Sequence, residues 1–180
     1  LYTGSDDGLI HASTDGGQTW TRAAPLPGVP ERSFINKVEA DLHASGRVFA
    51  LADAHKQGDY TPYLFESADN GSSWTSIRGD LPDGTIVWAI QQDHWNPDLL
   101  FLAAEYGLYF TPNRGENWHM LSAGVPTIAF RDLKIHRRDD DLVGATFGRG
   151  FYILDDYSPL REIADGVLAG GGGVLPVRDA

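Results

Sequence analysis

The sequence predicts an all-β fold in which four-stranded antiparallel units recur along the chain, the arrangement of a β-propeller. Three observations support this prediction: one octet pattern occurs three times, short apolar segments precede each octet in the same order, and helical periodicity is weak before residue 157. The octets are STDGGQTW at 13–20, SADNGSSW at 67–74 and TPNRGENW at 111–118, and they begin 54 and then 44 residues apart. Four-stranded units that repeat at roughly 40 to 55 residues are typical of propeller blades.

Each complete unit is expected to supply three strands before its octet and one after it. The segments are rich in β-branched and aromatic residues and are separated by Gly, Asp, Asn and Pro, which is typical of strands and turns. The expected strands before the octets cover residues 1–5, 8–13, 35–43, 47–53, 63–68, 87–95, 99–105 and 107–112. The strands after the octets are WTRA, WTSI and WHML, and a fourth copy without an octet follows at 132–138, 141–147 and 150–156.

The predicted blades cover about 1–24, 33–78, 86–122 and 131–157, and the first blade lacks its inner strand. In the tail, Ser158 is expected to cap a helix with Pro159 at its first position. This helix runs to about Leu168, and a Gly-rich hinge at 170–173 and a short strand at 174–177 follow it. Closed propellers have roughly 4 to 8 blades, and the chain begins with Leu1, so we expect these residues to be a fragment of a larger propeller.

Composition and charge narrow the function. The chain has 180 residues, of which 42% are hydrophobic and 22% charged, as in ordinary globular proteins. Its 14 Lys and Arg stand against 25 Asp and Glu and are scattered, which disfavours a nucleic-acid partner. No apolar run approaches the roughly 20 residues of a membrane helix, so no membrane span is expected. The absence of Cys excludes disulfides and thiolate metal sites.

The octet is expected to be a structural hairpin turn between the third and fourth strands of a blade. Its glycine supplies a left-handed backbone position, its Asp or Asn accepts backbone hydrogen bonds, and its Trp covers the space between units. These positions are Ser13, Asp15, Gly17 and Trp20, then Ser67, Asp69, Gly71 and Trp74, then Thr111, Asn113, Gly115 and Trp118. A calcium loop needs several oxygen ligands at alternating positions. Each octet offers one, and the third contains Arg114, so no metal is expected.

The octets resemble Asp-box motifs, also called BNR repeats, which occur in sialidases, xyloglucanase-type glycosidases, sortilin-type receptor domains and many secreted bacterial propellers. The segments NPDLLFLAAEYGLYFTPNRGENW at 96–118 and GRGFYILDDYSPLREI at 148–163 resemble the sortilin-like branch of those bacterial proteins most closely. This resemblance implies a propeller fold and a secreted or periplasmic location. It also implies a ligand site away from the octets.

Topology separates the two ends of such a propeller. The turns between the second and third strands, and the links between blades, lie at the end opposite the octets, where clustered loops are expected to form a ligand site. The candidate ligand-binding residues at this end are His55, Tyr60, Tyr106, Arg131 and Arg149. Aromatic rings, arginines and carboxylates that converge in this way suit a sugar or an acidic peptide.

Two hypotheses for function stay open. The first is a module that binds a protein or glycan ligand, and the second is a glycoside hydrolase whose acids are shared with further blades. Hydrolysis needs two carboxylates about 5 to 10 Å apart, and the candidates are Glu105 with Asp6 or Asp7. Glu105 and Arg149 are either an acid with an anion clamp or a salt bridge. The arginine triad of sialidases and the catalytic aspartates of xyloglucanases have no matching motif.

Other polar motifs are expected to be structural. His43, His94 and His136 occupy matching blade positions, which fits turn and channel-lining roles better than a zinc site because the blades spread them around a ring. The run RRDDD at 137–141 is a solvated turn, and GGGG at 170–173 lacks the context of a phosphate loop. No cofactor is expected.

Overall fold

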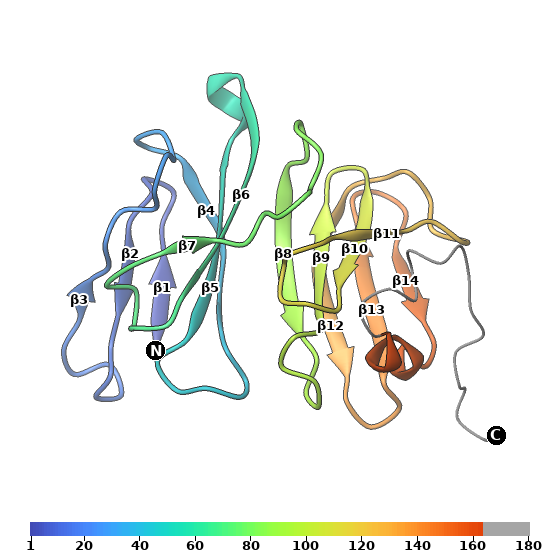
Figure 1. The fold of residues 1–180 in the computed structure, drawn as a ribbon. Coiled ribbons are helices and arrows are strands. Elements are labelled where there is room, and N and C mark those ends of the chain that lie inside the picture. Colours follow the sequence, from blue (N-terminus) through green and yellow to red (C-terminus); the bar gives the residue numbers. More distant parts are fainter. Residues whose placement is uncertain (164–180) are drawn as a thin grey trace.

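The regular structure of the chain consists of four antiparallel sheets and two short 3-10 turns, as Figure 1 shows for the computed structural model, which describes residues 1–163. The all-β prediction is confirmed. Each sheet is a meander in which strands that are consecutive in sequence are neighbours in space.

The first and last sheets have three strands each, and the middle two have four. The first contains β1 (Tyr2–Gly4), β2 (Ile10–Ala12) and β3 (Thr21–Arg22). The second contains β4 (Phe34–Ala40), β5 (Val48–Ala54), β6 (Asp59–Ser67) and β7 (Thr75–Ser76). The third contains β8 (Val87–Gln92), β9 (Leu100–Ala104), β10 (Gly107–Thr111) and β11 (His119–Leu121). The fourth contains β12 (Phe130–His136), β13 (Asp141–Thr146) and β14 (Phe151–Leu154).

The position of a strand in the stack explains its sequence. All residues of β5 and β9 are buried, because each of these strands has a neighbouring sheet on both faces. Their sequences, VFALADA and LFLAA, are accordingly almost continuous apolar runs. In β12 only one face packs on another described sheet, so buried Phe130 and Leu133 are interspersed with exposed Arg131 and Lys134.

The hydrophobic core lies between the sheets rather than within one layer. One group of buried side chains joins the first and second sheets around Ile10 and Phe65, and a second joins the second and third around Phe49 and Leu102. A third group joins the third and fourth sheets and includes Tyr157, which is 1% exposed. Each sheet therefore depends on its neighbours for burial, as expected for stacked blades.

The two ends of the stack carry different connections. The β5–β6 connection, which contains the 3-10 turn η1 (His55–Gln57), projects at the top of Figure 1. The β4–β5 and β12–β13 turns and the 3-10 turn η2 (Ser158–Glu162) lie at the bottom.

The tail differs from its prediction in one respect. The helix at Ser158 is a 3-10 turn whose N-cap is Tyr157, and no side chain caps it. Ser158 instead donates its hydroxyl hydrogen bond to Asp156. Pro159 does stand at the start of the turn. The predicted continuation to Leu168, the hinge at 170–173 and the strand at 174–177 lie outside the described residues.

Candidate functional site

The octets form three hairpin turns of the same construction. In each, the first hydroxyl accepts a hydrogen bond from the glycine N–H, at 2.8 Å from Gly17 to Ser13, 2.8 Å from Gly71 to Ser67 and 2.9 Å from Gly115 to Thr111. The central Asp or Asn accepts the N–H four residues later, at 2.8 to 3.0 Å.

Hydrogen bonds within the turn occupy the octet carboxylates. The bonds from Ser73 and Ser67 lower the pKa of Asp69 to about 2, and Asp15 shifts in the same direction through Thr19 and Ser13. These bonds hold each carboxylate toward the backbone of its own turn. The role of the octets is therefore to stabilise the turns.

The octet tryptophans pack backwards onto the preceding sheet. The indole N–H of Trp74 donates to the carbonyl of Ala24 at 2.9 Å, and that of Trp118 donates to the carbonyl of Ile77 at 3.0 Å. Both side chains are buried, at 9% and 6% exposure. Trp20 has no preceding sheet among the described residues, donates to Gly17 in its own turn, and is 43% exposed.

The contacts of Arg114 explain why the third octet carries an arginine. Its guanidinium donates to both carboxylate oxygens of Glu66 at 2.8 to 3.1 Å, to Asp41 and to the carbonyl of Pro97 at 2.8 Å. Asp41 and Glu66 belong to the second sheet and its turn, so this arginine fastens the third sheet to the second. The arginine has a structural role at the octet end.

At the opposite end, the inner strand of each of the last three sheets contains a β-bulge. The pairing register shifts by one residue between Ile35 and Lys37, between Val87 and Ala89, and between Phe130 and Asp132. The extra residues are Asn36, Trp88 and Arg131. A bulge redirects its side chain out of the normal alternation of the strand, and Asn36 accordingly reaches the next sheet, where it donates to the carbonyl of Val87 at 2.8 Å.

Trp88 and Arg131 are the centre of a polar and aromatic group that we call the Trp88 cluster, which also contains Asp53, His55 and Glu105. The Arg131 guanidinium lies over the Trp88 ring, 3.6 Å from its centroid. Glu105 accepts the Trp88 indole N–H at 2.9 Å and forms an ion pair with Arg131 at 3.4 Å. The cation–π contact and the ion pair together fix the orientation of Arg131.

His55 and Asp53 extend the Trp88 cluster onto the second sheet. The His55 ring lies 6.0 Å from the Trp88 ring in an edge-on arrangement. Its Nδ1 is 2.7 Å from both carboxylate oxygens of Asp53, which is 4% exposed. Because a carboxylate oxygen only accepts hydrogen bonds, Nδ1 is the donor of this pair. Three successive sheets therefore contribute to one constellation.

The predicted site residues Tyr60, Tyr106 and Arg149 are not members of the Trp88 cluster. Tyr106 lies in the β9–β10 turn and Tyr60 at the start of β6, and their side chains are 61% and 53% exposed. Arg149 is exposed in the β13–β14 turn, where its backbone N–H donates to Thr146. The ion pair of Glu105 is with Arg131 and not with Arg149, so the salt bridge considered between Glu105 and Arg149 is not formed.

Asp6 and Asp7 lie in the β1–β2 turn, with the whole second sheet between them and Glu105. The Asp7 carboxylate accepts a hydrogen bond from Ser5, and this bond lowers its pKa. A cleft of about 390 Å³ beside Asp7 is also lined by Glu31 and Arg32. This cleft belongs to the first sheet and its link, apart from the Trp88 cluster.

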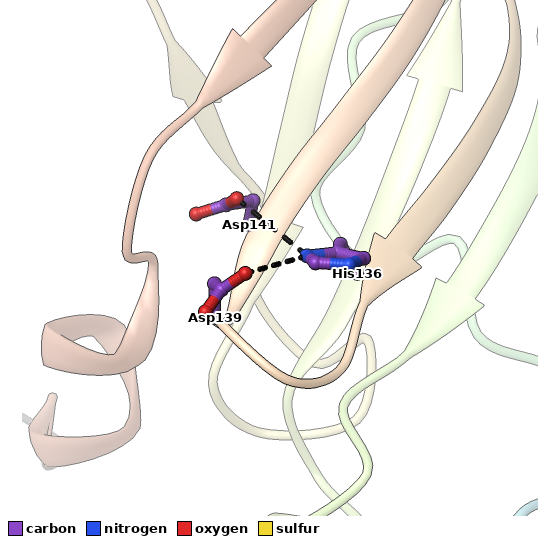
Figure 2. Close-up of side chains that lie close together, drawn as sticks. All are labelled: His136, Asp139 and Asp141. Carbon is purple, nitrogen blue, oxygen red and sulfur yellow. Dashed lines mark ion pairs between the residues drawn. The ribbon is translucent and has the colours of Figure 1, made fainter.

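A second group of polar side chains lies at the octet end, on the β12–β13 hairpin. Figure 2 shows His136 directed toward Asp139 and Asp141. Its Nδ1 lies 3.1 Å from Asp139 and 3.8 Å from Asp141, and one nitrogen or oxygen atom of each of the three side chains lies within 4.8 Å of the others. Arg138 also donates to Asp139, at 2.8 Å. This guanidinium supplies the positive charge that a cation would bring, so we read the group as an ion-paired turn.

The other two histidines at matching positions have different partners. His43 bonds the carbonyl of Asp93 at 2.8 Å. His94 lies between Asp93 and Asp140, and both of these carboxylates bind Arg161 of η2 at 2.7 Å. Arg161 thus repeats in the fourth sheet what Arg114 does in the third, since each fastens an Asp in the turn of the preceding sheet.

The sequence predicted Glu105, Arg131 and His55 as candidate site residues but did not point to Trp88 or Asp53. Trp88 stands inside the apolar run VWAI and resembles an ordinary core residue, and Asp53 ends a buried strand. No sequence signal marks a bulge. The one available indication was that Trp88 and Arg131 stand at corresponding positions, near the start of the inner strands of successive sheets.

Known proteins resemble the chain in sequence and in structure. It is 28% identical over 153 residues to vacuolar protein sorting/targeting protein 10 of Arthroderma gypseum, a match that covers 77% of this chain and 9% of that protein. It superposes on a GH74 enzyme of Niastella koreensis with a TM-score of 0.67 and 15% identity, covering 86% of this chain and 26% of that one. With YCF48 bound to D1 peptide, the TM-score is 0.61 at 17% identity, covering 87% and 46%.

These likenesses and the stack of antiparallel sheets define the chain as a segment of a β-propeller. Within that class, its sequence is similar to the sortilin-like vacuolar protein sorting/targeting protein 10. No protein-family model matches the chain. The chain spans less than half the length of each of these three proteins. No helix within residues 1–163 is long and apolar enough to cross a membrane.

Proposed function

We propose that the chain is part of a sortilin-like propeller that binds a protein or glycan ligand at the Trp88 cluster, on the end opposite the octets. The observation that supports this most is the state of Arg131, which is held by Trp88 and Glu105 while its side chain remains 39% exposed. A preoriented, accessible guanidinium binds carboxylate, phosphate or carbonyl oxygens at low entropic cost.

The surroundings of Arg131 suit a large ligand. The centroid of the Phe147 ring lies 5.5 Å from the guanidinium carbon of Arg131, and Phe147 is 71% exposed. Exposed aromatic side chains beside a fixed arginine are characteristic of recognition surfaces for macromolecules. YCF48, which shares the fold, is bound to a peptide, and this supports a peptide as the ligand here. A secreted or periplasmic location, suggested by the sortilin-like sequence, is part of the proposal.

A panel of peptides and glycans, titrated against the protein and its variants, tests the proposal. Arg131→Gln removes the charge and the bidentate donor, and we expect it to weaken binding about 10- to 100-fold. Arg138→Gln is the matched control, because Arg138 is also paired with an acid but lies at the octet end. Equal affinities for the two variants would contradict the proposal.

The alternative function is glycoside hydrolysis, which the shared fold of GH74 enzymes keeps open. The carboxylates disfavour it. Asp7 has a lowered pKa and is therefore a poor proton donor near neutral pH. Stacked sheets are about 10 Å apart, so Asp7 and Glu105 are separated by roughly 20 Å, beyond the spacing of a glycosidase pair. Turnover of a glycan that is lost in Glu105→Gln or Asp7→Asn would favour the enzyme.

We also infer that further blades complete this propeller. Trp20 supports this inference, because its two counterparts are buried against a preceding sheet while Trp20 is exposed. The test is acrylamide quenching of Trp20 fluorescence in a protein whose other tryptophans are replaced by Phe. Quenching should be weaker in a longer protein that contains residues 1–180 than in the 180-residue protein alone. Unchanged quenching would contradict the inference.

A further inference from the structure

The bulges of β4 and β8 are each linked to the bulge of the sheet that follows. Asn36, the extra residue of β4, donates its side-chain amide to the carbonyl of Val87, which directly precedes the extra residue of β8. That extra residue, Trp88, lies in turn against the guanidinium of Arg131, the extra residue of β12. Asn36 is therefore linked to the Trp88 cluster without being a member of it.

The carbonyl of Val87 is one that its own sheet does not use. Val87 stands opposite Ala104. The main-chain bond beside this pair runs from the N–H of Glu105 to the carbonyl of Ile86, at 3.0 Å. In an antiparallel ladder, a pair flanked in this way makes no bonds between its own two residues, so the Val87 carbonyl points to the edge of the sheet that β8 forms. Asn36 supplies the hydrogen bond there, at 2.8 Å.

The backbone at Trp88 depends on contacts from outside its own sheet. The pairing of β8 with β9 passes directly from Val87 to Ala89, so β9 has no residue opposite Trp88. The extra residue of a bulge is left unpaired in this way. Val87 is 1% exposed, so its carbonyl relies on the bond from Asn36 rather than on bulk water.

We propose that Asn36 is a positioning residue of the ligand site and sets the orientation of Trp88. The carbonyl of Val87 and the N–H of Trp88 belong to one planar peptide unit. A hydrogen bond that fixes this carbonyl therefore fixes the backbone from which the Trp88 side chain departs. The indole placed in this way donates to Glu105 and lies against Arg131. This role rests on the proposed function, because it requires a ligand at the Trp88 cluster.

The test follows the indole N–H signals of the five tryptophans in proton–nitrogen correlation spectra of the labelled protein. The Trp88 signal is the one that disappears in Trp88→Phe. Asn36→Leu removes the amide donor, and Asn36→Asp keeps the size of the side chain but replaces the donor by an acceptor. We expect both variants to shift the Trp88 signal, while the signals of Trp74 and Trp118 in the octets stay in place. Circular dichroism and thermal unfolding check that each variant is folded.

Ligand binding provides the second measurement. Both Asn36 variants should weaken the binding of a ligand selected from the peptide and glycan panel about tenfold, because each leaves the Val87 carbonyl without its donor. Asn117→Leu is the matched control. The side-chain amide of Asn117 also donates to another segment, to Asp80 at 3.2 Å, but Asn117 lies in the third octet. This control should leave both the affinity and the Trp88 signal unchanged.

Three outcomes would overturn the proposal. A Trp88 signal that neither Asn36 variant moves would show that another contact orients the ring. Equal shifts of all the tryptophan signals, or the same Trp88 shift in Asn117→Leu, would make Asn36 an ordinary structural residue. A shifted Trp88 signal with unchanged affinity would remove Asn36 from the ligand site. The spectra need no ligand, so failure of every peptide and glycan to bind would count against the proposed function and not against the link from Asn36 to Trp88.

Discussion

Replacing Trp118 by alanine should destabilise the protein severely, because the octets are scaffolding that packs one sheet on the next. Trp118 is 6% exposed, and its indole N–H donates to the carbonyl of Ile77. Burial of about 200 Å² of aromatic surface at about 25 cal/mol per Å² is worth about 5 kcal/mol. Buried Trp→Ala substitutions cost about 3 to 5 kcal/mol, which is the loss we expect in the free energy of unfolding.

Trp20→Ala is the matched control, since Trp20 occupies the same position of the first octet. It is 43% exposed and bonds only its own turn, so we expect a cost of about 1 kcal/mol. Urea unfolding of the 180-residue protein, followed by far-UV circular dichroism, measures both values. Equal costs for the two substitutions would refute the view that an octet tryptophan acts by packing on the preceding sheet.

Three further predictions concern charged side chains. Because the pKa of Asp69 is lowered from 3.8 to about 2, its carboxylate contributes stability that is present above about pH 4 and is lost as the pH falls through about 2. Asp69→Asn should therefore flatten the acid limb of a stability profile measured by thermal unfolding, and an unchanged limb would count against the turn geometry. Arg114→Gln should cost about 3 kcal/mol, because it leaves buried Asp41 without its cation and Glu66 with only Arg47, at 3.5 Å. Arg138→Gln, at an exposed pair, should change stability by less than about 0.5 kcal/mol in the same urea assay. Arg131→Gln should leave stability within about 1 kcal/mol while it weakens ligand binding, and a larger loss of stability would make Arg131 a structural residue.

The repeat made most of the fold predictable from sequence. The octets begin 54 and 44 residues apart, and their common neighbours fix the order of strands, so every predicted strand before Asp155 is present. The tail was less predictable: the sequence SPLRE suits an α-helix, but it forms a 3-10 turn. The ion pairs of Arg161 with Asp93 and Asp140 attach this turn to the third and fourth sheets. These partners are distant in sequence and leave no local pattern.

The candidate site was predictable only in part. The octets lie at one end of the blades, and the turns between second and third strands and the links between blades lie at the other. This rule led to Glu105, Arg131 and His55. It could not show that Arg131 and Trp88 are bulge residues, because a bulge depends on pairing between two strands and not on either sequence alone. The same limit applies to Arg114, whose partner Glu66 is 48 residues away.

The central claim, that ligand binds at the end opposite the octets, is tested most directly by hydrogen–deuterium exchange with and without a ligand selected from the peptide and glycan panel. The account predicts slower exchange in the β9–β10 turn around Glu105, at the start of β12 around Arg131, and in the β13–β14 turn. The octets at 13–20, 67–74 and 111–118 should exchange at unchanged rates. Protection confined to the octets, with none at Glu105 or Arg131, would contradict the account.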